Sequence, residues 1–466
     1  MPKTETATIR PDRVGHPSLL PSLSGLLREW LPRQRWFAGK GRPVTDLALL
    51  SVTELHPDCL HVLIRADHAE LPAIRGPGPA PVHDCYQLLL GIGEPPSPRL
   101  FPAAVLGRVT EGPLTGLSVY DALQEPHWAA LLLERLRTPG TTGALRFERD
   151  RRVKLPAGLP PRLLEAEQSN SSLVYGDSYI LKLFRRVRPG INPDLEVPWA
   201  LARQGCTRVP APVAWFRTSS PWHATLGVLQ PFLRGGVDGW TQALEALEAG
   251  RDFTAEAHEM GRATAEVHLA LAAAFPVESR GAAESERLAS GMVGRLRDAL
   301  HAVPELLPYA PELRSAVTEL AALDTPRPAQ RIHGDLHLGQ VLRAERQWHV
   351  IDFEGEPARP LPERRRIQCP VRDVAGMLRS FDYAAHARSP WRPDWALRCR
   401  EAYCAGYAAG AGWDPREHPG LLRAYETDRA VYEVLYEARH RPDWLPVPMA
   451  AIARLAERPG SRRPIP

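Results

Sequence analysis

The chain has 466 residues, 44% of them hydrophobic and 24% charged, and a formal net charge of only +4. This composition is typical of a globular protein with room for two or three domains, and it argues against nucleic-acid binding, which normally requires a clustered basic face. No apolar run approaches the length of a membrane span, the N-terminal sequence lacks the apolar stretch of a signal peptide, and none of the six cysteines follows zinc-type spacing. We therefore expect a cytoplasmic protein with free thiols.

The first hundred residues are predicted to mix helix and strand. A helical pattern covers residues 20–36, and strand-like runs bounded by Pro, Gly and Asp cover residues 47–55, 61–67 and 84–93. The stretch GIGEPPSPRLFP (91–102) is a plausible boundary. Residues 119–138 are then predicted to form one helix, which ends at the following PGTTG.

Strand patterns return over residues 146–233. Two strands are predicted around the polar turn in LLEAEQSNSSLVYGDSYILKLFRRV (163–187), followed by a helix over 193–205 and a strand over 225–233. From about residue 240 to residue 458 the pattern is mainly helical, interrupted by strand-like pieces around Asp335 and Asp352. A β-rich lobe followed by a helical lobe is typical of an enzyme with its chemistry in a cleft.

The polar turn and the strand after it suggest a nucleotide site. Small polar residues in a turn allow backbone N–H groups and hydroxyls to face an anion; those of the turn are Ser169, Asn170, Ser171 and Ser172. Lys182, one of only four lysines, stands on the second strand among apolar residues, and Glu196 follows on the next predicted helix. A strand lysine paired with a helix glutamate is the protein-kinase arrangement for phosphates. The alternatives are an ordinary hairpin turn and an edge-strand lysine that reaches out to solvent.

Two acidic turns complete the kinase-like order of motifs. Protein kinases carry H-R-D-x-x-x-x-N and then D-F-G, and this chain has HGDLHLGQ, from His333 to Gln340, and then DFEGE, which starts at Asp352. Asp335 is the expected proton acceptor for a substrate hydroxyl. The oxygens of Gln340, Asp352 and Glu354 are hard ligands suited to Mg²⁺.

A further acid, Asp373 in RDVAGMLRSFDYA, is predicted to accept hydrogen bonds from the backbone of the loop that begins at His333. The alternative for Asp373 is an ordinary acidic residue at a helix N-terminus.

At this point the chain resembles the actinobacterial maltokinases, within the aminoglycoside-phosphotransferase-like kinase fold. The stretches that carry the resemblance are LPRQRWFAGKGR, HGDLHLGQVLR, VIDFEGEP, RDVAGMLRSFDYAA and AVYEVLYEARHRPDWLP, in the family's order between residues 32 and 446. The resemblance implies an α+β, bilobal protein-kinase-like fold. It also implies an N-terminal cap subdomain (1–104), a kinase N-lobe or intermediate subdomain (105–234) and a helical C-lobe (235–466).

The resemblance further implies ATP-dependent phosphorylation of maltose at its anomeric hydroxyl. ATP and Mg²⁺ would be required, with the adenine near Gln230 and Phe232. The sugar is expected near Asp335, Asp352 and one face of the helix at 428–444, where four residues lie at i, i+4, i+7 and i+11, namely Arg429, Glu433, Tyr436 and His440. The family pattern has Tyr in place of Leu336 and Lys in place of Arg429, which leaves the exact sugar open.

Two other functions stay open. One is a glucosamine kinase or another sugar or aminoglycoside kinase of the same fold. The other is an inactive kinase-like subunit of a trehalose-converting complex, although the joint presence of Lys182, Asp335, Gln340 and Asp352 argues against it. The resemblance implies that maltose 1-phosphate feeds glycogen-type α-glucan synthesis from trehalose, and that trehalose synthase is a possible partner of a monomer or weak oligomer.

Overall fold

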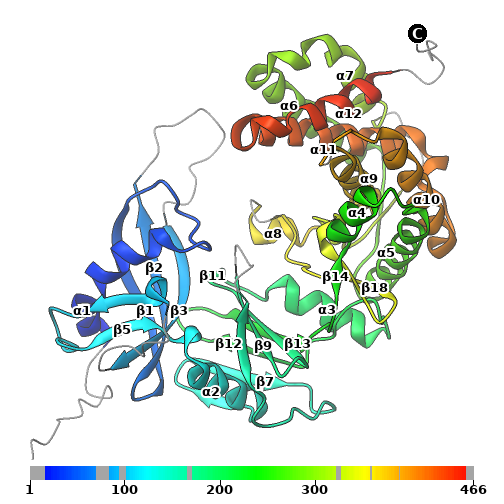
Figure 1. Cartoon of the computed structure of the whole chain (residues 1–466). Coiled ribbons are helices and arrows are strands. Elements are labelled where there is room, and N and C mark those ends of the chain that lie inside the picture. The colour runs from blue at the N-terminus through cyan, green and yellow to red at the C-terminus, as the bar shows by residue number, and fades with distance from the viewer. Residues whose placement is uncertain are drawn as a thin grey trace, which may run out of the picture. The chain divides into compact units, whose positions relative to one another are not determined.

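The computed structural model describes residues 16–69, 83–93, 101–164, 170–321, 327–356, 359–387 and 389–457. Two compact units make up the chain, Met1–Glu196 with Ala211–Arg234, and Val197–Pro210 with Gly235–Pro466 (Figure 1). Helix α3 (Pro193–Arg203) runs from the first stretch of one unit into the other. Of the helices described, not one combines the length and the apolarity that a membrane crossing needs.

A six-stranded sheet opens the first unit, next to helix α1 (His16–Trp30). Its main strands run antiparallel in the order β1-β2-β3-β5-β4, and β11 pairs with β3. Their bounds are β1 (Val44–His56), β2 (Cys59–His68), β3 (His83–Gly93), β4 (Val105–Arg108), β5 (Ser118–Asp121) and β11 (Arg186–Val187). Leu23 and Leu27 of α1 are fully buried and belong to the same apolar core as Val62 and Leu88 of the sheet. The helix therefore covers one face of this sheet.

A seven-stranded sheet forms the rest of the first unit. Its order is β6-β7-β12-β13-β10-β9-β8, so that β12 and β13 lie between strands that precede them in the chain. The strands are β6 (Gly140–Thr142), β7 (Leu145–Arg149), β8 (Pro161–Leu164), β9 (Ser171–Tyr175), β10 (Tyr179–Leu183), β12 (Ala214–Thr218) and β13 (Ala224–Pro231). Helix α2 (Pro126–Arg137) packs its leucines into the core of this sheet.

The prediction of one helix over residues 119–138 was wrong. Residues 118–121 form strand β5, and α2 starts only at Pro126. Proline at the first position of a helix has no N–H to lose and a backbone angle suited to the helix, so it marks the start of α2. The predicted polar turn is also shorter than expected, because Ser171 and Ser172 already belong to β9.

The two sheets of the first unit are joined by buried polar contacts. The Gln87 side chain on β3 donates a hydrogen bond of 2.9 Å to the carbonyl of Phe184, directly after β10. The Gln87 backbone N–H also donates to the carbonyl of Arg185, and the Arg185 guanidinium pairs with Asp121 at the end of β5. The predicted domain boundary at residue 104 lies within the sequence range of the first sheet, since β4 and β5 follow it.

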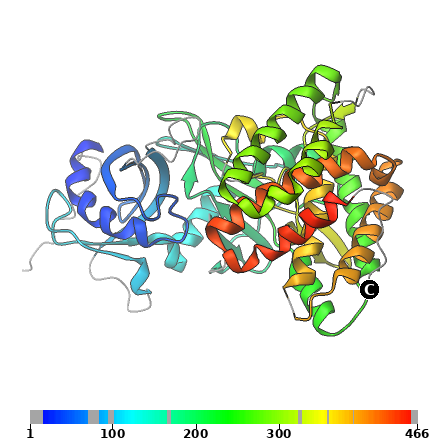
Figure 2. The ribbon, with the colours of Figure 1, turned by 90° about the horizontal axis from the view of Figure 1, so that it is seen from above.

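The second unit is mainly helical, as the ribbon from green to red shows in Figure 1 and, from above, in Figure 2. Its longer helices are α4 (Gly239–Glu248), α5 (Thr254–Ala274), α6 (Ala282–Ala302), α7 (Ala310–Thr318), α9 (Val371–His386), α10 (Pro393–Ala411), α11 (Pro419–His440) and α12 (Pro446–Ala456). A short helix, α8 (Leu361–Arg364), lies before α9. Small strands form two further sheets, β14 (Val237–Asp238) with β17 (Val341–Ala344) and β18 (Gln347–Val350), and β15 (Glu278–Arg280) with β16 (Arg327–Ala329).

Helices α5 and α10 pack against each other at very short range. A Cβ atom on Gly406 of α10 would lie 1.8 Å from the carbonyl oxygen of His258, and one on Gly261 of α5 would lie 2.0 Å from the carbonyl oxygen of Tyr403. Only glycine allows two backbones to approach so closely. This pair of helices forms the centre of the largest apolar core, which also holds Leu336 and Phe353 of the two acidic turns.

Candidate active site

The loop that carries Asp335 is held by buried hydrogen bonds on both sides. Its backbone N–H groups at His333 and Gly334 donate to the two carboxylate oxygens of Asp373, at 2.7 and 2.8 Å. The His333 ring donates through Nε2 to the carbonyl of Ile351, and its Nδ1 accepts from the Asp335 N–H at 3.3 Å. The ring therefore links the two acidic turns.

Asp373 lies in the first turn of α9 and is fully buried. Burial alone raises the pKa of a carboxyl group, but the hydrogen bond from His268 and the two backbone donors outweigh it, so the pKa of Asp373 lies below its usual value. The His268 ring is fixed in turn by the hydroxyl of Tyr407, at 2.9 Å. Asp373 is thus an ionised anchor for the loop, in the place that the sequence predicts for it.

Helix α9 also approaches the loop through a glycine. A Cβ on Gly376 would lie 2.7 Å from the carbonyl oxygen of Leu336. One turn further along, the hydroxyl of Ser380 accepts a hydrogen bond from the N–H of Leu338. Leu336 itself is buried in the apolar core, and its side chain is not in the lining of the large pocket described below.

The oxygen ligands that the sequence predicts for Mg²⁺ lie close together. The Gln340 amide nitrogen is 3.1 Å from Asp352 Oδ2, and carboxylate oxygens of Asp352 and Glu354 lie within 4.8 Å of each other. Asp352 adopts a left-handed backbone conformation (φ 65°), which is unusual for any residue but glycine and is often found at functional sites. Two carboxylates and an amide oxygen fit a hard divalent cation.

A pocket of about 670 Å³ opens beside Asp335 within the second unit. Its volume is in the range of ligand-binding pockets. Four tyrosine and tryptophan side chains line it, along with five acids and two arginines. The lining residues are Asp238, Trp240, Asp335, His337, Gly339, Glu356, Gly376, Ser380, Tyr383, Arg429, Tyr432, Glu433, Tyr436, Glu437 and Arg441.

Helix α11 supplies one wall of this pocket. Three of the four residues predicted to share its face line the pocket, namely Arg429, Glu433 and Tyr436. His440, the fourth, is exposed, and its ring lies 4.8 Å from that of Tyr436. The helix adds Glu437, and Arg441 follows directly after its end; the sequence reasoning missed both, since neither belongs to the predicted face.

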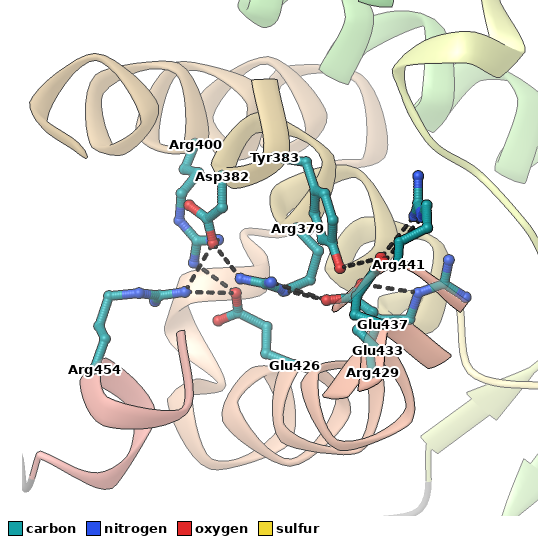
Figure 3. Close-up of polar contacts among 10 residues, drawn as sticks. All are labelled: Arg379, Asp382, Tyr383, Arg400, Glu426, Arg429, Glu433, Glu437, Arg441 and Arg454. Atoms are coloured by element: carbon teal, nitrogen blue, oxygen red, sulfur yellow. Dashed lines mark hydrogen bonds and ion pairs between the residues drawn. The ribbon is translucent and has the colours of Figure 1, made fainter. Parts of the chain in front are cut away.

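Arginines neutralise the acids of this wall, as Figure 3 shows. Glu433 pairs with Arg379 of α9 at 2.8 Å and with Arg429 at 3.3 Å, and the Arg429 guanidinium also reaches Asp335 at 3.5 Å. Glu437 pairs with Arg441 at 2.6 Å and accepts a hydrogen bond from the Tyr383 hydroxyl, at 3.0 Å.

Burial and neighbouring charges shift the pKa values of three side chains that line the pocket. Burial alone lowers the pKa of Arg429, but the facing carboxylates of Glu433 and Asp335 raise it above the ordinary value. Burial lowers the pKa of His337, which keeps this ring neutral near pH 7. Burial and the charge of Glu356 raise the pKa of Tyr432 to about 12.

The residues predicted for the nucleotide lie in the first unit. Lys182 on β10 forms an ion pair of 2.9 Å with Asp194, and both side chains are largely buried. Asp194 lies two residues before the predicted partner Glu196, in the first turn of α3. The sequence reasoning considered Glu196 alone and missed Asp194. Ser171, Ser172 and Asn170 are buried at the start of β9, whereas Ser169 lies outside the described residues.

The two residues predicted to lie near the adenine are close in sequence: Gln230 lies near the end of β13, and Phe232 follows directly after this strand. Gln230 pairs with Ile180 across β10 and β13, and the Phe232 N–H donates to the carbonyl of Ser178. Both side chains are half-buried. They therefore lie near the N-terminal end of β10, the strand that carries Lys182.

Comparison with known proteins supports this reading of the fold. Residues 30–125 match the maltokinase N-terminal cap domain, and residues 160–419 match the phosphotransferase enzyme family. Among curated proteins, the chain is 29% identical over 317 residues to a glucosamine kinase of Streptacidiphilus jiangxiensis (62% of this chain, 72% of the relative). It is also 29% identical over 318 residues to a glucosamine kinase of Mycolicibacterium smegmatis (64% of this chain, 79% of the relative).

Solved structures show the same architecture. A glucosamine kinase in complex with glucosamine, ADP and inorganic phosphate superposes with a TM-score of 0.65 at 24% identity, covering 93% of this chain and 99% of that one. A second crystal form of a glucosamine kinase gives a TM-score of 0.67 at 23% identity. The predicted α+β kinase-like fold is confirmed, with an N-terminal cap, a sheet-rich N-terminal part and a helical C-terminal part. The match to the phosphotransferase enzyme family covers more than half of the chain, and the chain therefore belongs to this family.

Proposed function

We propose that this chain transfers a phosphoryl group from ATP to the anomeric hydroxyl of maltose, giving maltose 1-phosphate and ADP. The match to the maltokinase cap domain supports this function. The observation that carries it is the charge state of the large pocket, where every acid in the wall is already engaged by a partner within the chain.

The five acids of the pocket wall illustrate this balance. Glu433 and Glu437 are paired with arginines, Asp335 faces Arg429, and Glu356 pairs with Arg359 at 2.7 Å. Asp238 accepts hydrogen bonds from the backbone N–H and the hydroxyl of Thr241 at the start of α4. A cationic amino sugar would have to compete with these partners for a carboxylate, whereas a neutral sugar needs only hydrogen bonds.

The aromatic residues of the pocket suit the same class of substrate. Trp240, Tyr383, Tyr432 and Tyr436 present ring faces and polar groups together in the lining. A pyranose ring has an apolar face of C–H groups and a rim of hydroxyls, and aromatic rings with a polar edge can satisfy both. The size of the pocket accommodates two such rings.

The chemistry asks the protein mainly for positioning and for charge stabilisation. In the proposed mechanism Asp335 orients the anomeric hydroxyl and accepts its proton, while Lys182, held by Asp194 and the predicted partner Glu196, binds phosphate oxygens. Mg²⁺ held by Gln340, Asp352 and Glu354 would neutralise charge on the triphosphate. His337 lines the pocket, and its Nδ1 accepts from the Gly339 N–H, so in the neutral ring the proton is on Nε2.

A glucosamine kinase is the second candidate. The curated relatives and the superposed structures named above favour it, since they carry that name over most of this chain's length. The paired acids of the pocket argue the other way.

The test is a substrate panel of maltose, glucosamine and kanamycin with ATP and Mg²⁺, with the products identified by phosphorus NMR. We expect a phosphate on the anomeric carbon of maltose and a kcat/KM for maltose at least about tenfold above that for glucosamine. The Asp335→Asn variant is the control for a contaminating kinase. A higher kcat/KM for glucosamine would overturn the maltose assignment and leave the phosphotransferase assignment intact.

The pathway and the partner follow from the same proposal. A maltose 1-phosphate product would feed glycogen-type α-glucan synthesis in the cytoplasm, and trehalose synthase is the expected partner, as the family resemblance implies. Co-elution of the two proteins from a sizing column, against each protein alone, tests the partnership.

A further inference from the structure

A buried cluster of arginines and acids lies behind the wall of the pocket, at the crossing of α9, α10, α11 and α12 (Figure 3). Its central residue is Arg379 of α9, whose side chain is only 1% exposed. Replacement of a buried ion pair by well-packed apolar groups is often neutral or stabilising. The presence of a buried arginine therefore calls for a reason other than stability.

The two acids that pair with Arg379 differ in how many other arginines they contact. Asp382 pairs with Arg379 at 2.6 Å, but it also pairs with Arg400 at 3.3 Å and with Arg454 at 3.2 Å. Asp382 thus has two further cations besides Arg379. Within the described part of the chain, the ion pairs of Glu433 are those with Arg379 and Arg429.

The two oxygens of the Glu433 carboxylate are divided between these arginines. Oε2 accepts a hydrogen bond from Arg379 Nε at 2.9 Å and has Arg379 Nη2 in ion-pair contact at 2.8 Å, whereas Oε1 accepts from Arg429 Nε at 3.3 Å. The other nitrogen of Arg429, Nη2, lies 3.5 Å from Asp335 Oδ1. An arginine and a carboxylate prefer a fork of two parallel bonds, and Arg379 occupies the oxygen that would complete such a fork between Arg429 and Glu433.

We propose that Arg379 is a positioning residue: by holding one oxygen of Glu433, it leaves Arg429 free to hold Asp335 in place for the reaction. The chain of contacts runs from Asp382 through Arg379, Glu433 and Arg429 to Asp335. This inference rests on the proposed role of Asp335 as the proton acceptor. Arg379 would then affect turnover although it does not line the pocket.

The first test combines Arg379→Met with Arg429→Met. Without Arg379, both nitrogens of Arg429 turn to Glu433 and leave Asp335, so each single variant should lower kcat at least about tenfold, with the KM for ATP within about threefold of wild type. Because both changes remove the same contact, the double variant should be within about twofold of Arg429→Met alone. If the decrease in kcat of the double variant equals the product of the two single decreases, the proposal is overturned.

The matched control is Arg400→Met. Arg400 is buried in the same cluster and pairs with Asp382 and Glu426, but it does not contact Glu433. We expect it to lower the unfolding temperature while kcat at 25 °C stays within about threefold of wild type. A tenfold loss of kcat in this control would show that any damage to the cluster impairs turnover, which contradicts a specific role for Arg379.

If Arg379→Met does not fold, the double variant Arg379→Met/Glu433→Gln replaces it as the charge-balanced variant. Arg379→Met with Glu433→Gln leaves no unpaired carboxylate, and a neutral amide binds Arg429 more weakly than a carboxylate does. Arg429 then stays with Asp335 whether or not Arg379 is present, so kcat at saturating sugar should lie within about twofold of that of Glu433→Gln alone. A further loss of about tenfold or more relative to Glu433→Gln contradicts the proposal.

The readout is turnover of whichever sugar the wild-type chain phosphorylates, so a wrong choice between maltose and glucosamine leaves the test intact. A crystal structure of Arg379→Met, or of the charge-balanced variant if it alone folds, adds a readout without any substrate. In Arg379→Met, Arg429 should bind both oxygens of Glu433; in the charge-balanced variant it should remain beside Asp335. The opposite position of Arg429 in either structure would overturn the proposal.

Discussion

Asp335 is the residue on which the proposed chemistry depends most directly. Its backbone N–H is held by the His333 ring and its carboxylate faces Arg429 at 3.5 Å. Asp335→Asn keeps the size and the hydrogen-bonding shape of the side chain but removes the proton acceptor. We expect kcat to fall by roughly 10²- to 10⁴-fold, while titration calorimetry shows ATP binding within about threefold of wild type. Near-normal turnover would contradict the assignment.

Lys182 offers a second test at the scale of single residues, through its ion pair with Asp194 of α3. The ion pair with Asp194 is largely buried, and removal of one partner of a buried pair leaves a charge without compensation. We expect Asp194→Asn to raise the KM for ATP by at least about tenfold. The KM for the sugar, measured on the same variant, is the control, and an unchanged KM for ATP would contradict a role of this ion pair in nucleotide binding.

Single residues also mark the limit of what the sequence predicts about the site. Helical spacing placed Arg429, Glu433 and Tyr436 on one face, and all three line the pocket. The same spacing cannot identify Arg379, which reaches Glu433 from another helix 54 positions away. It also does not indicate that Asp194 pairs with Lys182, since Asp194 and Glu196 both lie in the first turn of α3 and the path of the neighbouring strand decides which contacts form.

At the scale of elements, the packing of α5 on α10 makes a prediction about stability. A methyl group on Gly406 would lie 1.8 Å from the carbonyl oxygen of His258, so Gly406→Ala must push the two helices apart. We expect the free energy of unfolding to fall by about 1–3 kcal/mol or more, measured by denaturant unfolding.

Gly294 provides the matched control for this substitution. It lies within α6, and a Cβ added there meets no atom within 4 Å. Gly294→Ala should therefore stabilise the protein by about 0.5–1 kcal/mol, because alanine has less conformational freedom to lose in a helix. Equal effects of the two substitutions would show that the close approach of α5 and α10 does not limit stability.

Elements with a strong period were predictable, and short ones were not. The hydrophobic pattern indicated the long strands of the first sheet and the helical C-terminal half. It merged β5, a strand of four residues, with α2, because the apolar and polar residues of 119–138 also fit a helical period. A two-residue strand such as β11 carries no periodic signal, and only its pairing with β3 defines it.

At the scale of the whole molecule, the order of the motifs predicted the fold class, and the family match confirms it. The order of strands was not predictable, since β12 and β13 enter the seven-stranded sheet between earlier strands. That order depends on contacts between distant segments. The same holds for the buried contacts of Gln87, which join the two sheets across 97 positions of sequence.

A buried histidine within the first unit couples its folding to pH. His61 on β2 is 3% exposed, and its Nε2 lies 3.1 Å from the amide oxygen of Gln87. Burial lowers the pKa of His61 to about 4, although the hydrogen bond with Gln87 acts in the opposite direction. In an unfolded chain the pKa of histidine is about 6.5.

The sign of the effect follows from these two pKa values. Between pH 6.5 and pH 4 the unfolded chain binds a proton at His61 and the folded chain does not, so the folded state loses stability as the pH falls. From pH 7 to pH 5 the loss attributable to His61 amounts to about 2 kcal/mol. The first unit should therefore unfold at a markedly lower temperature at pH 5 than at pH 7.

The variant His61→Gln isolates this contribution, because glutamine can still donate a hydrogen bond to Gln87 but does not titrate. Other histidines titrate in the wild type and in the variant alike, so the difference between the two pH profiles belongs to position 61. We expect the unfolding transition of the variant to change less between pH 7 and pH 5, by an amount equivalent to about 2 kcal/mol. Parallel profiles for the two proteins would mean that His61 takes up its proton in the folded state as readily as in the unfolded one, and that the contact between the two sheets at Gln87 opens to water.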